Sequence, residues 1–303
     1  MSIYVELLIR SPLETIWAHT QDPKLHERWD LRFSEIESLS AVHTNTPARF
    51  RYLTRIGLGL EIKGYGQTTA HRLLSDGSAV SALEFRSEDR RSLIKEGSGY
   101  WKYVPRSNGV RFLTSYDYEP RFGRLGRVLD SLAFRPLMGW ATAWSFDRLR
   151  IWVETRIEPE IALRHALIHC VARWAIAAVF IYQGVFPKIL RRNIAESTML
   201  ANLGIPENLA PMVAVGTGVA EVVFGLAVLF FWRSRLPAFI ALVVMGLATL
   251  SVAFAAPSYL TAAFNPVSLN LAVASLATVD LLTKPEWTPT ASRCLRKPPP
   301  GNT

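Results

Sequence analysis

Residues 236–265 read LPAFIALVVMGLATLSVAFAAPSYLTAAFN and contain no charged side chain. Hydrocarbon offers no hydrogen-bonding partner to the backbone, so an uninterrupted apolar run of about 20 residues is stable in a bilayer only as a helix. Further apolar runs lie on both sides of this stretch. The C-terminal half of the 303-residue chain is therefore predicted to lie in a membrane.

Four hydrophobic segments predict an all-α, four-helix transmembrane bundle within residues 162–284. Their approximate bounds are 167–186, 211–232, 236–256 and 267–282. Small residues recur at Gly216, Gly218, Gly225 and Gly246, where neighbouring helices can approach closely. We therefore expect a packed bundle rather than four independent anchors.

Positive charge is unequal on the two sides of this bundle, and residues 1–10 lack the basic and apolar regions of a signal peptide. The positive-inside rule then predicts a bacterial-type inner (plasma) membrane protein with both termini in the cytoplasm. The residues assigned to the cytoplasmic side are Arg148, Arg150, Arg156, Arg164, Arg233, Arg235, Lys284, Arg293, Arg296 and Lys297, and those assigned to the other side are Lys188, Arg191 and Arg192.

Glu221 lies near the middle of the second segment, where an ionised carboxylate costs several kcal/mol unless it is protonated or paired. One hypothesis is a proton or quinone site, and the other is a buried hydrogen bond that locks the bundle. The candidate polar neighbours are Arg173, Lys188, Asn270 and Asp280. His165 and His169 would share a helix face, but no third ligand is evident, so we predict no metal and interpret them as a polar helix end.

The end of the first segment, FIYQGVFPKIL at 180–190, resembles the DoxX-like family, in which an aromatic-rich helix runs into Gly-x-x-Pro-Lys. Glu221 followed by Gly225, and Asn265-Pro266 before the last segment, are similar to that family as well. The resemblance covers residues 164–284 and implies a small four-helix inner-membrane protein. Some relatives are subunits of thiosulfate:quinone oxidoreductase.

The N-terminal half shows the period-two alternation of strands, as in RFRYLTRI at 49–56 and at residues 111–119, where Phe112, Thr114, Tyr116 and Tyr118 share one face. From 125 to 154 the period becomes helical, and Pro136 is predicted to start a second helical piece. The residues expected to lean on the sheet are Leu125, Leu129, Leu132, Leu137, Trp140, Trp144 and Leu149.

A curved antiparallel sheet closed by a long C-terminal helix resembles the START-like, or SRPBCC, helix-grip fold, an α+β class. The opening PLETIW at 12–17, Asp22-Pro23 and HERWD at 26–30 are similar to that superfamily. Its members bind sterols, lipids, polyketides or plant hormones between sheet and helix, and a minority are cyclases or hydrolases. We assign residues 1–155 to this domain and predict that 285–303 form a disordered tail.

The interior of the helix-grip domain is the predicted binding site for a small apolar or lipid-like molecule. The residues expected to line it are Tyr52, Thr54, Phe85, Trp101, Thr114, Tyr116, Trp140 and Trp144. The alternative is that these side chains simply fill the core. No catalytic motif is visible, and His19, His26, His43 and His71 are scattered and interpreted as surface or capping residues, so we favour a binding protein over an enzyme.

The expected partners are membrane lipids and the hydrophobic ligand. The net charge of +9 forms no basic stripe with interleaved aromatic residues, so nucleic acid is not expected, and Cys170 and Cys294 are interpreted as free thiols. No cofactor is predicted for a carrier, sensor or accessory protein. The alternative function is a membrane subunit of a quinone-linked oxidoreductase, in which Glu221 would meet quinone and a separate oxidoreductase subunit would supply the redox chemistry.

Overall fold

The structure is a computed structural model that describes residues 2–39, 48–57, 59–261 and 265–298. The chain forms two compact units. The first comprises Met1–Leu163 together with Glu286–Thr303, and the second comprises Arg164–Pro285. The first unit is therefore built from two separate stretches of sequence, with the second unit inserted between them.

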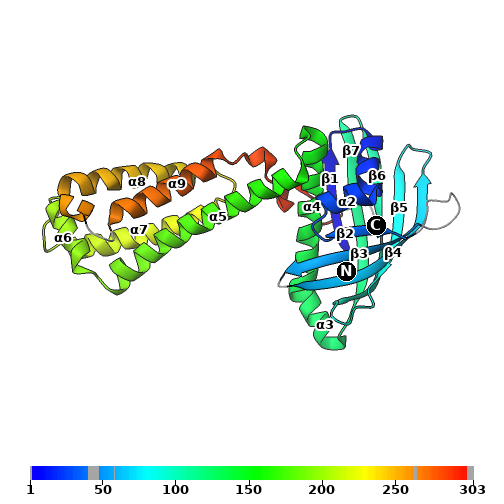
Figure 1. Ribbon diagram of the computed structural model, residues 1–303, viewed down its shortest axis with the longest axis horizontal. Coiled ribbons are helices and arrows are strands. Elements are labelled where there is room, and N and C mark those ends of the chain that lie inside the picture. Colours follow the sequence, from blue (N-terminus) through cyan, green and yellow to red (C-terminus); the bar gives the residue numbers. More distant parts are fainter. Residues whose placement is uncertain (1, 40–47, 58, 262–264, 299–303) are drawn as a thin grey trace. The chain divides into compact units, whose positions relative to one another are not determined.

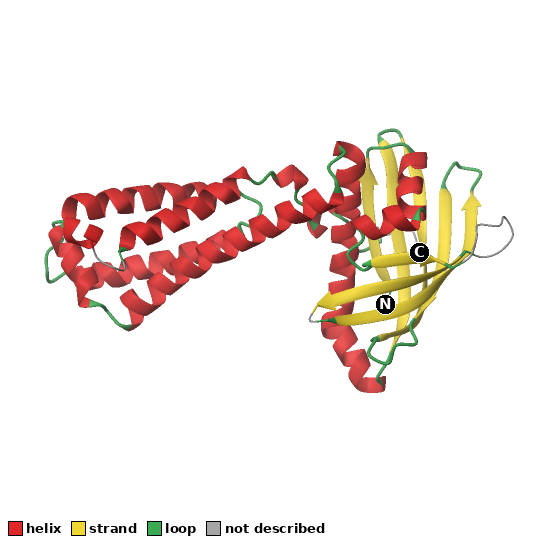
Figure 2. Ribbon diagram, in the orientation of Figure 1, coloured by secondary structure: helices red, strands yellow, loops and turns green. Residues whose placement is uncertain are grey.

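A seven-stranded antiparallel sheet in the order β1-β7-β6-β5-β4-β3-β2 forms the body of the first unit (Figures 1 and 2). Alternate residues of β7, from Val110 to Tyr118, are buried, as the period-two pattern predicts. The strands are β1 (Ile3–Ile9), β2 (Glu35–Ser38), β3 (Arg49–Gly57), β4 (Leu60–Leu73), β5 (Ala79–Arg86), β6 (Ile94–Arg106) and β7 (Gly109–Pro120).

Helices α1 (Leu13–Gln21), α2 (Pro23–Trp29) and the long α4 (Arg135–Thr155) accompany the sheet. The Phe146 ring of α4 stacks on Phe112 of β7 with centroids 4.4 Å apart, and Phe112 in turn stacks on Tyr103 of β6 at 5.0 Å. These three rings are fully buried and form the centre of the core. A bent antiparallel sheet held against a long C-terminal helix is the predicted helix-grip fold.

The helical stretch that leads into α4 consists of α3 (Gly123–Leu129) and one π-helical turn, η1 (Asp130–Phe134). The prediction that this stretch leans its leucines on the sheet is wrong, because Leu125, Leu129, Leu132, Leu137 and Trp140 are 44–78% exposed. Trp144 and Leu149, farther along α4, are buried as predicted. A π turn shifts the phase of the helix, so one continuous period cannot describe both parts.

The segment after residue 285, predicted to be disordered, is ordered against the first unit as far as residue 298. Leu295 exchanges two backbone hydrogen bonds of 2.9 Å with Glu6 of β1. The Thr290 amide donates to Asp147 at 2.8 Å, and the Cys294 thiol donates to the Ala143 carbonyl at 3.2 Å. The proline-rich composition suggested disorder, but the residues just before the prolines find partners. Residues 299–303 lie outside the described residues.

The second unit contains helices in the four predicted places. The helices are α5 (Pro159–Gln183), which continues into the π-helical η2 (Gly184–Leu190), then α6 (Ile194–Asn202), α7 (Ala210–Phe230), α8 (Leu236–Ala255) and α9 (Pro266–Leu282). Within the described residues, three helical stretches are long and apolar enough to cross a membrane: Pro159–Leu190, Ala210–Phe230 and Leu236–Phe254. At 17 residues, α9 is about 26 Å long, slightly less than the hydrocarbon thickness.

Glycine allows close approach between parts of this unit at two positions. A Cβ on Gly184 would lie 2.4 Å from the Gly218 carbonyl oxygen, and one on Gly225 would lie 3.0 Å from the Ala177 carbonyl oxygen. Gly216 and Gly246, by contrast, have nothing within 4 Å of that position. Only some of these glycines therefore lie where a neighbouring segment packs closely against them.

Candidate functional site

A buried ionic cluster follows α2 in the interior of the first unit. The Asp22 side chain caps the start of α2 by accepting from the amides of Lys24 and Leu25, and the helix ends at Trp29. The next residue, Asp30, has a fully buried side chain. Its carboxylate accepts from Arg32 Nε at 2.9 Å and Arg32 Nη2 at 2.6 Å, and His26 Nε2 lies 3.1 Å from it.

The charge state of this cluster follows from competing effects. Burial alone raises the pKa of Asp30, but the charge of Arg32 and the hydrogen bonds from Arg32 and His26 outweigh it and hold that pKa well below its usual range. The carboxylate is therefore ionised and fixes the guanidinium of Arg32, whose side chain is only 12% exposed. A bidentate pair of this kind determines position as well as charge.

Aromatic rings and hydroxyls surround Arg32. Its guanidinium carbon lies 5.4 Å from the ring centroid of Tyr116 and 5.5 Å from that of Phe33. The Thr54 hydroxyl donates to the Arg32 carbonyl at 2.6 Å, and the Phe33 ring packs edge-on against Tyr52 at 5.4 Å. A cation set among ring faces, with hydroxyls beside it, is suited to hold an acidic or carbonyl group on an otherwise apolar molecule.

The structure brings together some of the predicted lining residues. Tyr52, Thr54 and Tyr116 meet around Arg32 and Phe33, and Phe85 packs against Tyr116 at 6.4 Å. The Tyr116 hydroxyl shares a hydrogen bond of 2.8 Å with Thr142 of α4, which ties this wall to the long helix.

Among the remaining predicted residues, Trp101 contacts the ionic cluster, because its buried ring packs 4.9 Å from His26. The Thr114 hydroxyl donates to the Tyr100 carbonyl at 3.0 Å. Trp140 is 44% exposed and contacts Trp144 at 6.4 Å, so it does not line an enclosed interior. Trp144 is buried and has the Arg148 guanidinium 5.8 Å from its ring.

The ionic cluster itself was missed from the sequence. His26 was interpreted as a surface or capping residue, but its side chain is only 12% exposed and its ring stacks on Trp29 at 4.9 Å. The available signal was the spacing of His26 and Asp30, four residues apart at the end of α2, with Arg32 two positions further on. Charged residues are fully buried almost only when they are paired, and this spacing allows the pairing.

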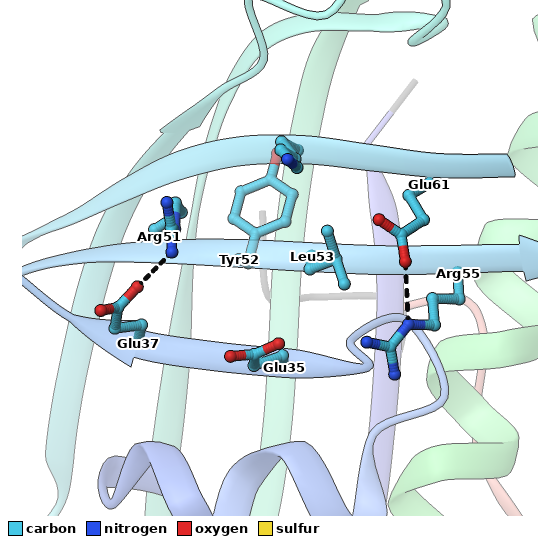
Figure 3. A pocket seen from close by; sticks show the side chains of 8 residues that line it. Glu35, Glu37, Arg51, Tyr52, Leu53, Arg55 and Glu61 are labelled. Atoms are coloured by element: carbon cyan, nitrogen blue, oxygen red, sulfur yellow. Dashed lines mark hydrogen bonds and ion pairs between the residues drawn. The ribbon is translucent and has the colours of Figure 1, made fainter.

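Two open depressions mark the sheet surface outside this cluster. In the smaller one, of about 200 Å³, Arg51 pairs with Glu37 at 2.6 Å and Arg55 with Glu61 at 3.1 Å (Figure 3). The larger one, of about 730 Å³, crosses β3 to β6 and includes Phe50 and Phe85 among charged side chains. The paired charges and the open form of the smaller depression indicate a solvated face rather than a ligand site.

The polar residues predicted within the membrane half separate into three pairs. Lys188 of η2 pairs with Glu221 of α7, and Asn270 of α9 donates to Thr249 of α8 at 3.3 Å. Of the four candidate neighbours of Glu221, the structure selects Lys188. The second carboxylate oxygen of Glu221, Oε2, is buried and has no hydrogen-bond partner among the residues that the structure describes.

Arg173 and Asp280 form the third pair, at the C-terminal end of α7, whereas Lys188 contacts the middle of that helix. Arg173 Nε lies 3.0 Å from Asp280, and its Nη atoms donate to the carbonyls of Val228, Phe231 and Ser234. His169 joins the same carboxylate, with Nδ1 2.6 Å from Asp280 and Nε2 2.9 Å from the Trp232 carbonyl. These contacts join α5, the end of α7 and α9.

Sequence comparison matches the chain to a protein family and to a membrane protein of known sequence. Residues 177–278 match the DoxX-like family. The membrane protein YndG of Bacillus subtilis (strain 168) is 46% identical over 183 residues, which is 60% of this chain and 68% of YndG.

Among solved structures, TTHA0849 from Thermus thermophilus is similar at 16% identity over 52% of this chain and 99% of its own, with a TM-score of 0.40. A STAR-related lipid transfer protein from Xanthomonas axonopodis is similar at 16% identity over 50% of this chain and 85% of its own, also with a TM-score of 0.40.

The fold and the family match define a membrane protein in which a helix-grip domain is joined to a DoxX-like domain. The chain belongs to the same family as the Bacillus subtilis membrane protein YndG.

Proposed function

We propose that the helix-grip domain binds a small apolar or amphipathic molecule that carries an acidic or carbonyl group, as a carrier, sensor or accessory protein. The observation that supports this proposal is Arg32, fixed by a buried carboxylate and set between the rings of Phe33 and Tyr116, with Tyr52 packed against Phe33. A guanidinium held in this way is oriented before a ligand arrives, which lowers the entropy cost of binding. The rings supply the apolar contact.

The test compares ligands that differ only at the polar end. The full-length protein in detergent would be titrated with a fluorescent long-chain fatty acid and with its methyl ester. A charge-assisted hydrogen bond contributes about 1.5–3 kcal/mol, so the acid should bind roughly 10- to 100-fold more tightly than the ester. Native mass spectrometry of the purified chain would show whether a lipid-like molecule is retained from the cell.

Matched variants distinguish Arg32 from general effects of charge. Arg32→Met should remove the preference for the acid, while Arg55→Met, on the solvated outer pair with Glu61, should leave it unchanged. Because Arg32→Met leaves Asp30 without its partner, Tyr116→Phe provides a second variant that keeps the ion pair and removes one wall hydroxyl. Absence of binding by the unmodified chain for both acid and ester would refute the proposal.

We further propose that the helices α5, α7, α8 and α9 all span the inner membrane with both termini in the cytoplasm. Support comes from the three stretches that are long and apolar enough to span and from the excess of Lys and Arg on one side. Two reporter enzymes fused after residue 298 would test this orientation, one that is active only in the cytoplasm and one that is active only outside it. Activity of the external reporter alone would contradict it.

The alternative, a membrane subunit of a quinone-linked oxidoreductase, is favoured by one observation: the Oε2 atom of Glu221 is buried and has no hydrogen-bond partner in the described part of the chain. That atom is an acceptor at which a quinol hydroxyl or a proton could be held, with Lys188 on the other carboxylate oxygen. Glu221→Gln should then abolish quinone-linked turnover while leaving the fold intact. Unchanged turnover would leave the Lys188–Glu221 pair with a structural role in joining η2 to α7.

A further inference from the structure

The outer face of α3, η1 and the start of α4 is an exposed apolar surface, here called the apolar face. It consists of Phe122, Leu125, Val128, Leu129, Leu132 and Leu137, which are each 51–78% exposed. Single exposed leucines are ordinary, but a contiguous apolar strip along four helical turns is rare on a surface that contacts only water.

The orientation of this stretch is fixed, so the apolar face cannot turn inward. Asp130 is buried on the opposite side, where it accepts from the Tyr118 hydroxyl at 2.5 Å and from Arg135 Nε at 2.8 Å. Gly126 lies on that side as well, and a Cβ there would come 1.6 Å from the Arg121 carbonyl oxygen. Rotation would break these contacts and leave the buried Tyr118 hydroxyl without its acceptor, which is costly.

Cationic side chains border the apolar face. Arg124 and Arg127 are exposed, and within the part of the chain that the structure describes neither has an acidic partner. The only acidic residue between Phe122 and Trp140 is Asp130, which faces inward. The exposed side of this stretch therefore combines apolar and positive groups and carries no negative charge.

We propose that the apolar face docks on an anionic lipid surface. An apolar helix face with arginines beside it matches the layers of a bilayer, where acyl chains lie beneath negative headgroups. The unit that carries this face is tethered to the apolar helices, because only residues 156–158 separate α4 from α5. A second copy of this chain fits less well, because it would have to bring a complementary acidic surface to Arg124 and Arg127. The proposal does not depend on the identity of the ligand.

The test uses the full chain in proteoliposomes. Cys170 and Cys294 would be replaced by Ala, and a single cysteine introduced as Leu129→Cys would carry an environment-sensitive NBD fluorophore. Glu88→Cys, at an exposed loop position whose side chain is 74% exposed, provides the matched control. Vesicles would contain phosphatidylcholine with or without phosphatidylglycerol, together with lipids that bear a nitroxide quencher.

The expected result is a blue-shifted emission of the Leu129→Cys label that nitroxide lipids quench in the anionic vesicles, while the Glu88→Cys label remains unquenched. Each arginine near an anionic surface contributes about fivefold to binding, so the Arg124→Gln, Arg127→Gln double variant should shift the docking equilibrium about 25-fold toward the undocked state. An unquenched, water-like emission in anionic vesicles would overturn the proposal. A blue-shifted emission that nitroxide lipids do not quench, and that increases with the density of protein in the vesicles, would also overturn the proposal. It would indicate contact between copies of the chain instead.

Discussion

The ion pair of Arg173 with Asp280 provides the sharpest test of how the second unit is held together. Both side chains are almost fully buried, at 1% and 2% exposed. Replacing Asp280 with Asn keeps the shape of the side chain and removes its charge. Arg173 would then be a buried cation that faces only neutral groups, namely the new amide and the carbonyls of Val228, Phe231 and Ser234.

The expected loss in the free energy of unfolding follows from the cost of leaving one member of a buried ion pair without its partner, which is about 3–5 kcal/mol. The carbonyls near the C-terminal end of α7 carry part of the negative pole of the helix dipole and retain some compensation for Arg173. We therefore expect the lower end, about 3 kcal/mol. At about 2–4 °C for each kcal/mol, the melting temperature should fall by roughly 6–12 °C.

The assay is thermal unfolding of the full chain in detergent, followed with a thiol-reactive fluorophore. In a Cys294→Ala background the remaining cysteine is Cys170, in α5, so the signal reports on the second unit. Glu207→Gln, which removes an exposed carboxylate from the same unit, is the control and should not change the midpoint.

A double variant separates an unpaired charge from loss of packing. Arg173→Met together with Asp280→Leu removes both charges and should recover part of the loss, because neither ion is left alone. His169 then loses its carboxylate partner, so recovery should be incomplete. A midpoint for Asp280→Asn within about 1 °C of the parent would correspond to well under 1 kcal/mol and would refute the reasoning.

Three further outcomes are expected. Gly184→Ala should destabilise the second unit by about 1–3 kcal/mol, because its Cβ would lie 2.4 Å from a backbone oxygen of α7, whereas Gly216→Ala, with open space, should be neutral in the same melting assay. Asp30→Ala should lower the free energy of unfolding by about 3–5 kcal/mol at pH 7, because it leaves Arg32 unpaired. Since the pKa of Asp30 is depressed in the folded state, the stability difference between parent and variant should be complete above about pH 5 and should shrink as the pH falls. Equal stability of the two proteins at pH 7 would contradict this prediction. Burial raises the pKa of the Cys294 thiol to about 12, so maleimide at neutral pH should label this cysteine only after the protein unfolds. Mass spectrometry would measure the labelling, and rapid labelling of the native chain would show that Cys294 is not buried.

The sequence predicted the two architectures because each depends on a periodic pattern. Uncharged runs of membrane length predict helices, and the alternation around Phe112 and Tyr116 predicts strands with one covered face. Helix orientation was harder. The leucines at 125, 129 and 132 have the spacing of a core-facing stripe, but the contacts of Asp130 with Tyr118 and Arg135 turn the opposite side inward. Contacts with residues that are distant in the sequence decide which side of such a helix faces inward, and a local hydrophobic period does not reveal those contacts.

The candidate site shows the same limit. Tyr52, Thr54 and Tyr116 follow from strand alternation, which predicts that they share the covered face of the sheet. Arg32 did not follow, because it lies in an irregular segment after α2 and becomes buried only through Asp30 and rings from other elements. Likewise, the choice of Lys188 rather than Arg173 as the partner of Glu221 depends on which helices are neighbours, and hydrophobicity alone does not order them.

The bridge between Leu295 and Glu6 has a consequence for biosynthesis. A ribosome releases β1 before the membrane helices have been made, and it releases Leu295, which pairs with β1, only after them. The edge of β1 therefore remains unpaired at this position while the translocation machinery inserts the intervening segments. Completion of the helix-grip domain is in this way coupled to successful insertion, and a chain stalled in the membrane step would present an unfinished sheet edge to quality-control proteases.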